Sequence, residues 1–437
     1  MLNFLKILFL LYAGQIPKSL KAKGSAMRNL RIRLVYMKST EQVCPYRKKC
    51  GGCQLQNLSY PEQLRFKMAK EIRLLGRFHR VSPIIAMENP YHYRAKVQAA
   101  FTKRSGKIIS GVYQSSTHNI VEVENCLIED EKADEIISTI RNLLKSFKLK
   151  AFNDREMTGF LRHVMVRRSF STGQIMVVLV TFTREFPSCR SFVNALVSRH
   201  EEITTVVQSV NSRYTSMVLG DEMKVLYGKG YIEDELCGCI FRISPSSFYQ
   251  VNPVQTVPLY KTAIDQLGLD GTQTVIDAYC GTGTIGIIAA KKAGRVIGTE
   301  INAEAISSAK QNAKLNGCGN VKFYAADAGE FLKEFAQSGQ KADAVIMDPP
   351  RAGASKEFLK ALVQIKPEKI SYVSCCPETL ARDLGYLTKG GYRVRSIQPV
   401  DMFPHTEHIE TVALLESGKV PVAAMSGKHR KYEKRGE

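Results

Sequence analysis

The chain lacks three features that would fix its class at once. It has no apolar run long enough to cross a membrane, since the segment from Met1 to Ala13 is too short and lacks a basic start. It has no internal repeat, and its 11 cysteines form no even disulfide framework. These absences argue against membrane, repeat and disulfide-stabilised secreted proteins. They favour a monomeric protein of the reducing cytoplasm with no membrane partner.

Acidic residues are scarce in the first quarter of the chain. The 437 residues carry a formal net charge of +21, and residues 1–110 hold 22 Lys and Arg against only 4 Asp and Glu. The remaining residues are nearly neutral, with 40 against 37. A basic surface on a neutral body predicts a polyanion whose phosphates release counterions when Lys and Arg neutralise them. A solvated basic face without a partner is the alternative.

The pattern along the chain divides it into five parts, and its length allows two or three domains. The parts are a basic, partly flexible extension (1–43), a cysteine-rich region (44–85), a β-rich α+β region (86–238), an α/β region (239–417) and a disordered basic tail (418–437). Within the second part, Leu64, Met68, Ile72 and Leu75 recur at helical spacing and predict a helix.

The α/β region predicts a mainly parallel, seven-stranded, Rossmann-like sheet. Its candidate strands are Val275–Ala278, Arg295–Thr299, Val321–Tyr324, Ala344–Met347, Ile370–Val373, Tyr392–Val400 and Thr411–Leu415. The first strand leads into the glycine-rich stretch Gly281-Thr-Gly283-Thr-Ile-Gly286, which allows a sharp turn and close approach to a nucleotide. Glu300 ends the next strand, where a carboxylate can accept hydrogen bonds from ribose hydroxyls. A dinucleotide oxidoreductase and an S-adenosylmethionine (SAM) enzyme both use such an acid.

Residues downstream favour SAM over a dinucleotide. Asp327 ends the third strand, in reach of an adenine amino group, and Asp348-Pro-Pro-Arg351 ends the fourth. The double proline stiffens the backbone at the open strand ends, where ligands bind in such sheets. Asp-Pro-Pro at this place is typical of methyltransferases that act on nucleobases.

The tandem thiols Cys375 and Cys376 follow the fifth strand, and buried filler is the alternative to chemistry for such residues. Carbon 5 of uracil becomes nucleophilic only after a thiolate adds to carbon 6, and a base must later remove the carbon 5 proton. Glu410 is the predicted base, with Glu407 in reserve. His405 and His408 with either glutamate form an alternative metal site.

A second group of cysteines lies mainly at the start of the cysteine-rich region (44–85). Cys44, Cys50 and Cys53 stand close together, and Cys126 is the best-placed fourth ligand by context. Four thiolates suit zinc or an iron–sulfur cluster equally on spacing alone.

From Cys44 to about Leu415 the chain resembles the SAM-dependent RNA (uracil-5-)-methyltransferases, above all the bacterial branch that modifies 23S ribosomal RNA. The motifs are Gly51-Gly-Cys-Gln54, Phe248-Tyr-Gln250-Val-Asn252, Tyr279-Cys-Gly-Thr-Gly283, Asp348-Pro-Pro-Arg351, Ser374-Cys375 and His408-Ile-Glu410. The resemblance implies Cys375 as nucleophile and Glu410 as base. It implies a [4Fe–4S] cluster on Cys44, Cys50, Cys53 and Cys126. It also implies SAM contacts from Gln250, Tyr279, Gly281, Gly283, Thr284, Glu300, Asp327 and Asp348.

Two departures from the family pattern stand out. Cys376 occupies the place where the family has Asn, and only 43 residues precede Cys44, so the N-terminal β-barrel (TRAM) domain of many relatives is expected to be absent. The expected partner is RNA and not DNA. A transfer-RNA uridine is the alternative substrate, although bacterial transfer-RNA relatives generally lack the cysteine cluster. A non-catalytic RNA-binding or ribosome-assembly protein is the alternative from another class.

Overall fold

The structure is a computed structural model that describes residues 43–115 and 117–418, and the predictions for the N-terminal extension and most of the tail lie outside them. The first helix of the described residues is α2 (Tyr60–Leu75), which confirms the helix predicted from its spacing. Its buried face differs from the apolar one that the spacing suggested. The helix buries Gln63, Lys67, Glu71 and Leu75, while Ile72 is 55% exposed.

The central region forms a seven-stranded sheet in the order β3-β2-β1-β4-β5-β6-β7. Neighbouring strands are antiparallel except for β5 and β6. Two helices pack on one face, where they share a core with the strands. Its elements are β1 (Lys96–Arg104), β2 (Lys107–Tyr113), β3 (Ile120–Glu122), α3 (Glu131–Ser146), β4 (Leu161–Arg168), β5 (Ile175–Thr181), α4 (Cys189–Val197), β6 (Ile203–Val210) and β7 (Glu222–Tyr227).

A hairpin links this region to the next and lies across the expected division at residue 238. Strand β8 (Ile232–Leu236) pairs with β9 (Cys239–Ile243) in a separate two-stranded sheet. Ile232 and Ile243 pack against Met165 and Val178 of the central sheet, whereas Leu236 and Phe241 belong to the core that follows. The hairpin therefore belongs to both cores, and the five-part division stays a proposal.

The last region confirms the predicted seven-stranded, mainly parallel sheet, in the order β12-β11-β10-β13-β14-β16-β15. The five strands from β12 to β14 are parallel, and β16 is antiparallel to both of its neighbours. The strands are β10 (Thr274–Ala278), β11 (Arg295–Glu300), β12 (Val321–Ala325), β13 (Ala344–Met347), β14 (Lys369–Ser374), β15 (Tyr392–Val400) and β16 (Glu410–Ser417).

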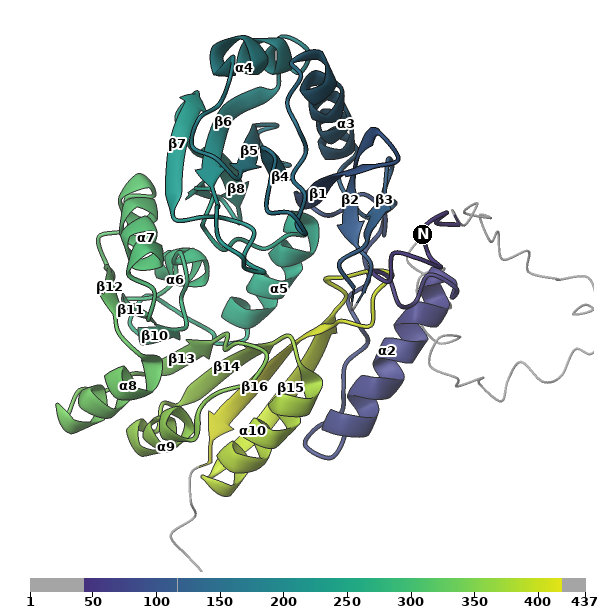
Figure 1. The fold of residues 1–437 in the computed structure, drawn as a ribbon. Helices are drawn as coiled ribbons and strands as arrows, with labels where there is room; N and C mark the ends of the chain where they lie inside the picture. Colours follow the sequence, from purple (N-terminus) through teal and green to yellow (C-terminus); the bar gives the residue numbers. More distant parts are fainter. Residues whose placement is uncertain (1–42, 116, 419–437) are drawn as a thin grey trace, which may run out of the picture. The chain divides into compact units, whose positions relative to one another are not determined.

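Helices cover both faces of this sheet, as Figure 1 shows. One core includes residues of α5 (Pro253–Asp265), α6 (Thr284–Ala290) and α7 (Ala303–Leu315). The other includes residues of α8 (Ala328–Gln337), α9 (Lys356–Ile365), α10 (Pro377–Lys389) and the end of α2. Open sheets of this kind bind ligands beyond the carboxyl ends of their parallel strands. Among the described residues, no helix is both long and apolar enough to cross a membrane.

Candidate active site

The turn between β10 and α6 is held in a conformation that brings the backbone close to its surroundings. Tyr279, Gly281 and Gly283 all have positive φ, at 63°, 52° and 79°. A Cβ atom at Gly283 would lie 2.7 Å from the Phe323 ring, so only glycine fits there. Left-handed backbone is unfavourable for a residue such as Tyr279 and is typical of functional turns. The predicted nucleotide-binding turn is therefore present at the carboxyl end of β10.

The buried carboxylate of Asp277 holds this turn in place. Asp277 was not among the site residues predicted from the sequence. Asp277 is 1% exposed, and its Oδ2 accepts a hydrogen bond of 2.8 Å from the backbone N–H of Gly286. A Cβ atom at Gly286 would lie 2.6 Å from the same oxygen. Burial raises the pKa of Asp277 to about 7, against the lowering effect of that hydrogen bond. Its place directly before the glycine-rich stretch was the signal that could have identified it.

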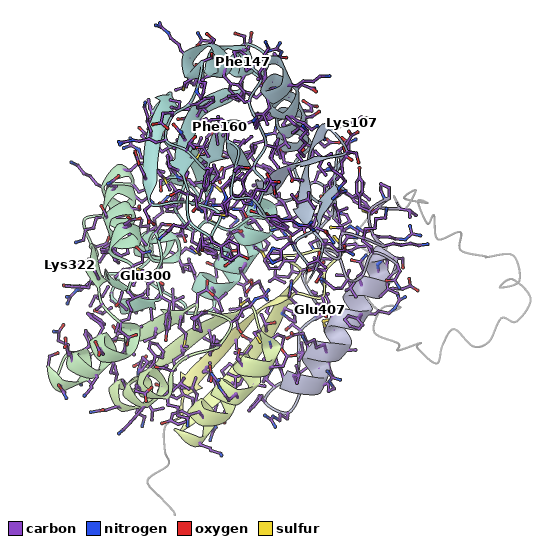
Figure 2. The ribbon with its side chains drawn as sticks, viewed as in Figure 1. Lys107, Phe147, Phe160, Glu300, Lys322 and Glu407 are labelled. Atoms are coloured by element: carbon purple, nitrogen blue, oxygen red, sulfur yellow. The ribbon has the colours of Figure 1, made fainter. Side chains whose placement is uncertain are left out.

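The acids at the next two strand ends cap the adjoining backbone. Glu300 accepts hydrogen bonds from the N–H of Gly281 at 3.3 Å and of Asn302 at 3.0 Å, and Figure 2 labels it in the α6–β11 part of the sheet. Asp327 caps α8 through its Oδ1, which accepts from Gly329 at 2.9 Å. Both predicted acids thus lie at the carboxyl edge of the sheet, where a nucleoside would meet them.

The Phe-Tyr-Gln-Val-Asn motif approaches the same turn from the start of α5. Asn252 caps α5, and Tyr260 of that helix lies 3.3 Å from the Thr284 hydroxyl, oxygen to oxygen. Gln250 lies close enough to the Tyr260 side chain to lower its pKa slightly, against the larger raising effect of burial. The structure therefore brings Gln250 and Thr284 together, 34 residues apart in the sequence, beside the glycine-rich turn.

Three acidic groups meet where β13 and β14 end and β16 begins. Cys375 follows β14, Asp348 follows β13, and Glu410 begins β16. Burial, followed by the charges of Glu410 and Asp348, raises the pKa of the Cys375 thiol to about 11. Burial also raises the pKa of Asp348 to about 7, and it holds that of Glu410 well above its usual range, with a smaller contribution from Asp348. The thiol is therefore protonated at neutral pH, and both carboxyl groups hold their protons more tightly than ordinary ones.

One cation opposes these effects. Arg351 lowers the pKa of both Cys375 and Glu410, although less than burial raises them. Its guanidinium lies 3.3 Å from both ring nitrogens of His408. Both residues stand within the quoted motifs, but only the folded chain shows that they meet. Arg351 was missed as a site residue because its neighbours come from a strand end 57 positions away.

The tandem thiols have different neighbours. Cys376 caps α10, and its Sγ contacts Glu378 Oε2 at 3.5 Å. Its N–H donates to Ser374 Oγ at 3.2 Å. Cys375, in contrast, is the thiol whose pKa responds to Glu410 and Asp348. Both cysteines are free and half-buried, and only Cys375 belongs to the acidic group.

The structure supports neither Glu407 as the base nor a metal site at His405 and His408. Glu407 is exposed, whereas Glu410 is 4% exposed and lies in the acidic group. His405 is buried against Gln63, 3.1 Å away, while His408 faces Arg351. Within residues 43–115 and 117–418, no group of three or more His, Cys, Asp or Glu residues is arranged to hold a metal ion. The His405–His408 alternative is therefore wrong, because the two rings serve different neighbours.

The same finding bears on the four N-terminal cysteines. Burial is the main cause of the raised pKa of Cys53, and the charges of Cys50 and Cys44 add to it; the charge of Cys53 adds slightly to the raised pKa of Cys126, which is also due mainly to burial. The thiols are thus near one another, but in the described part of the chain they form no ligand cage. The predicted metal site is not formed here, although the donor set has the chemistry of one.

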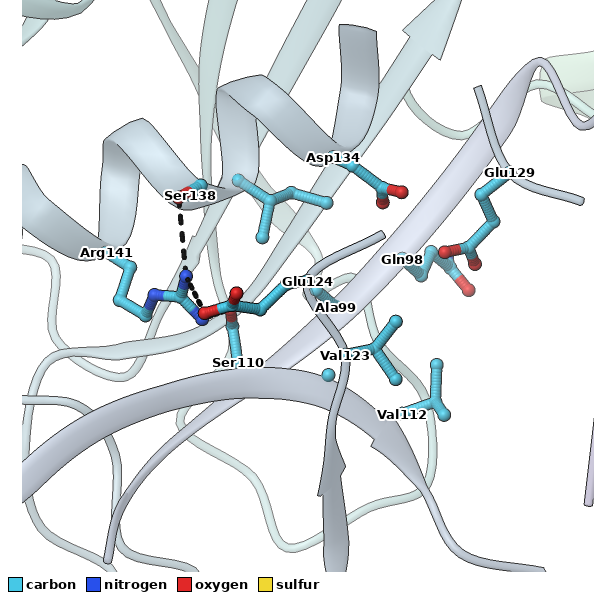
Figure 3. A pocket seen from close by; sticks show the side chains of 12 residues that line it. Gln98, Ala99, Ser110, Val112, Val123, Glu124, Glu129, Asp134, Ser138 and Arg141 are labelled. Atoms are coloured by element: carbon cyan, nitrogen blue, oxygen red, sulfur yellow. Dashed lines mark hydrogen bonds and ion pairs between the residues drawn. The ribbon is translucent and has the colours of Figure 1, made fainter. Parts of the chain in front are cut away.

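Carboxyl groups surround the fourth cysteine. Figure 3 shows Glu124, Glu129 and Asp134 lining a small cavity of the central region. The Asp134 carboxylate accepts a hydrogen bond of 2.7 Å from the N–H of Cys126. Burial raises the pKa of Glu129 to about 7, and burial followed by the charge of Glu129 raises that of Cys126. These surroundings favour a neutral thiol until a cation replaces the proton.

The fold and the edge of the sheet define the class of the protein, which is a SAM-dependent α/β methyltransferase. The chain belongs to the tRNA (uracil-5-)-methyltransferase family, whose profile matches residues 59–418. It is 31% identical to the crystal structure of Pyrococcus abyssi tRNA (uracil-54, C5)-methyltransferase in complex with S-adenosyl-L-homocysteine. That match has a TM-score of 0.71 and covers 84% of this chain and 86% of the other.

Curated relatives agree with this assignment. An uncharacterized RNA methyltransferase of Clostridium tetani is 46% identical over 379 residues, 86% of this chain and 82% of the relative. Another, from Halalkalibacterium halodurans, is 40% identical over 422 residues, 93% and 92% of the two chains. The family resemblance read from the motifs is confirmed, and the dinucleotide oxidoreductase alternative is wrong. The protein is an RNA methyltransferase that uses SAM.

Proposed function

We propose that the protein methylates carbon 5 of a uridine in RNA, with Cys375 as nucleophile and Glu410 as general base. The observation that carries the proposal is the meeting of Cys375, Glu410 and Asp348 at three neighbouring strand ends, with mutually raised pKa values. Groups whose pKa values are shifted by burial and by one another gather at active sites, where their protonation states serve the chemistry. A thiol beside a buried carboxyl group is the pair that uracil chemistry requires.

The residues would act in two stages. The Cys375 thiolate forms a bond to carbon 6 of the uracil, and the carbon 5–carbon 6 π electrons move into an enolate that makes carbon 5 nucleophilic. SAM, when bound, supplies the methyl group and a positive sulfonium charge. The Glu410 carboxylate then takes the carbon 5 proton, the electrons of that bond restore the double bond, and the Cys375 sulfur leaves as thiolate.

Arg351 would help both groups reach their reactive charge states. In the free protein Cys375 and Glu410 hold their protons, whereas the nucleophile must be a thiolate and the base a carboxylate. A positive charge nearby stabilises both anions, and Arg351 already supplies one. The reacting uridine must also leave its base stack to reach the edge of the sheet.

The SAM site is assigned to residues around the glycine-rich turn. Supporting this are the positive φ angles there, the contact of Gln250 with Tyr260 and the placement of acids at successive strand ends. The assigned residues are Gln250, Tyr279, Gly281, Gly283, Thr284, Glu300, Asp327 and Asp348. Calorimetric titration with S-adenosylhomocysteine should show at least tenfold weaker binding to Glu300→Ala; unchanged affinity would remove Glu300 from the site.

The first test concerns the nucleophile. Cys375→Ala should abolish methyl transfer and the covalent adduct with RNA that contains 5-fluorouridine. The matched control is Cys376→Ala, which removes the neighbouring thiol from the same turn and should retain adduct formation. Activity in Cys375→Ala would refute the mechanism, and adduct loss in Cys376→Ala alone would exchange the roles of the two thiols.

The proposed substrate is 23S ribosomal RNA. The four-cysteine group favours it, because bacterial transfer-RNA relatives generally lack that group, and the basic N-terminal quarter suits a large RNA. Transfer RNA is the second candidate, since the family description and the Pyrococcus abyssi enzyme both name it. Methylation of transcripts of both RNAs, followed by mass spectrometry of RNA from a deletion strain, distinguishes them. Methylation of transfer RNA alone would overturn the ribosomal assignment.

A [4Fe–4S] cluster on Cys44, Cys50, Cys53 and Cys126 is the proposed state of the N-terminal thiols. Their mutual effect on pKa supports it, while closing the ligand cage requires the sulfurs to converge further. The cluster would have a structural role, and no step of the methyl transfer is assigned to it. Iron and sulfide analysis of anaerobically purified protein tests the assignment. Tightly bound zinc without iron would refute it.

A further inference from the structure

Helix α2 buries polar side chains where a helix ordinarily buries apolar ones. Gln63, Lys67 and Glu71 are each at most 1% exposed, and their spacing of four residues puts them on one face of the helix. That face lies against the segment between β15 and β16, residues 401–409, which we call the base loop because Glu410 directly follows it. In Figure 2 the label of Glu407, within this loop, stands beside α2.

The middle of the face is a fully buried ion pair. Lys67 Nζ lies 2.5 Å from Asp401 Oδ1, and both side chains are 0% exposed. Tyr60 donates to the other Asp401 oxygen at 2.9 Å, and Lys67 also donates to the carbonyl of Phe403 at 3.0 Å. The desolvation of two buried charges largely offsets their attraction, so such a pair is weak evidence for stability. What it does fix is the position of the loop against the helix.

The next contact holds a strained residue. His405 has a φ of 67°, a conformation that L-residues rarely adopt. Its N–H donates to Gln63 Oε1 at 2.8 Å, and its carbonyl accepts from the N–H of Leu55 at 3.0 Å. Glu407 N–H contacts Gln54 Oε1 at 3.4 Å. Gln54 and Leu55 directly follow Cys53, so the cysteine segment (residues 44–58) holds the loop as well.

The last contact is next to the proposed base. Glu71 Oε2 accepts a hydrogen bond of 2.9 Å from the Thr411 hydroxyl. Successive strand residues point to opposite faces of a sheet. Thr411 therefore faces α2 while Glu410 faces the other way, so α2 holds the strand end from behind.

We propose that α2 and the cysteine segment form a clamp that positions Glu410 for proton abstraction, with Lys67 and Gln63 as positioning residues. Through the clamp, the cysteine segment would influence catalysis without contacting the substrate. The conformation of residues 44–58 would affect the position of Glu410 through the contact of Leu55 with His405 and through the base loop. This proposal rests on the proposed function, because it assumes that Glu410 removes the carbon 5 proton. Small displacements of a catalytic group can slow its step by about 100-fold.

The test uses the charge-neutral double variant Lys67→Met/Asp401→Asn, which leaves no uncompensated charge in the interior. With native RNA it should bind SAM normally, turn over at least roughly tenfold more slowly, and accumulate a denaturant-resistant methylated protein–RNA adduct. The accumulation is the informative readout, because a general loss of structure would reduce adduct formation together with turnover. The matched control is Lys292→Met, which removes an exposed lysine 2.7 Å from Asp265 and should show no accumulation.

If the double variant does not fold, Gln63→Met decides the question by the same readout, since it removes both contacts to His405 at similar volume. Normal turnover in a folded variant, or parallel loss of SAM binding and adduct, would overturn the clamp. The parent Glu410→Gln variant separates the two proposals. Accumulation in Glu410→Gln but not in the clamp variants refutes the clamp alone, whereas no accumulation in Glu410→Gln refutes the proposed function itself.

Discussion

The chain contains two groups of thiols, each with at least one member whose pKa is raised, and the two groups differ in their surroundings. Burial raises the pKa of both Cys375 and Cys53 to about 11. Beside Cys375, a second and a third acid with raised pKa share the edge of the sheet with Arg351. Cys126 of the other group lies among the buried carboxyl groups Glu129 and Asp134. A raised pKa by itself therefore does not identify a nucleophile. A nucleophile is identified by the groups around the thiol and by the protons that those groups can accept or donate.

Among the changes that test this comparison, the largest effect on the rate of methyl transfer is expected from removing Arg351, the cation beside Cys375. Arg351→Met should lower methyl transfer at pH 7 by roughly 10- to 100-fold, because the pKa values of Cys375 and Glu410 rise further without it. Rapid-quench single-turnover assays measure the change. Arg395→Met, which removes an exposed arginine paired with Glu416, is the control and should behave as the parent. A rate in Arg351→Met equal to that of the control would separate Arg351 from the chemistry.

The pH dependence should be next in size. Both acting groups are protonated in the free protein, so the reactive fraction grows as pH rises, by up to about tenfold per pH unit below the controlling pKa. Single-turnover rates at saturating SAM should therefore increase from pH 6 to 9, and the Arg351→Met profile should lie at higher pH. A flat parent profile over this range would mean that neither proton controls the reaction.

A smaller effect is expected from the second group. Cys53→Ser should lose bound iron and reduce methyl transfer by about tenfold or less, since these thiols act only through the position of the base loop. Iron content and turnover are measured on the same preparation. Cys318→Ser, at a half-buried free cysteine of the α/β region, is the control and should change neither. Loss of activity as complete as in Cys375→Ala would contradict the distinction between the two groups.

The smallest effect, one on stability and not on turnover, is expected from Glu71 of α2. Burial raises the pKa of Glu71 to about 7 from an ordinary 4.5. The folded protein holds this proton more tightly than the unfolded chain, so the resulting stability is complete below pH 4.5 and is lost as pH rises to 7.

Glu71→Gln keeps an acceptor for Thr411 without a charge to bury. Its free energy of unfolding should match the parent near pH 4.5 and exceed it by at most roughly 3 kcal/mol at pH 8. Denaturant titrations at both pH values measure this difference. A constant difference across pH would mean that folding does not raise the pKa of Glu71.

The sequence predicted the parallel sheet and its glycine-rich turn well because their signals are local. Apolar patterns located the parallel strands, including those that end at Glu300 and just before Asp348, and glycines marked the turn with positive φ. Strand boundaries agreed within a residue or two because buried parallel strands are apolar along their length.

The base side was less predictable because its contacts join distant segments. The spacing of Leu64 and Ile72 predicted α2 correctly but not its buried face, which is set by Asp401 and His405 more than 330 residues later. The pairing of Arg351 with His408 likewise depends on β16 returning antiparallel beside β14. Periodicity detects which residues form a helix, but the charge of a distant loop decides which of its faces is covered.

The central claim is that Glu410 removes the carbon 5 proton after Cys375 has added to the ring. The most direct measurement is mass spectrometry of Glu410→Gln incubated with SAM and unmodified substrate RNA, then denatured. The account predicts a covalent adduct between Cys375 and RNA that carries the methyl group, with little free methylated product. Release of free 5-methyluridine at the parent rate, with no adduct, would contradict it.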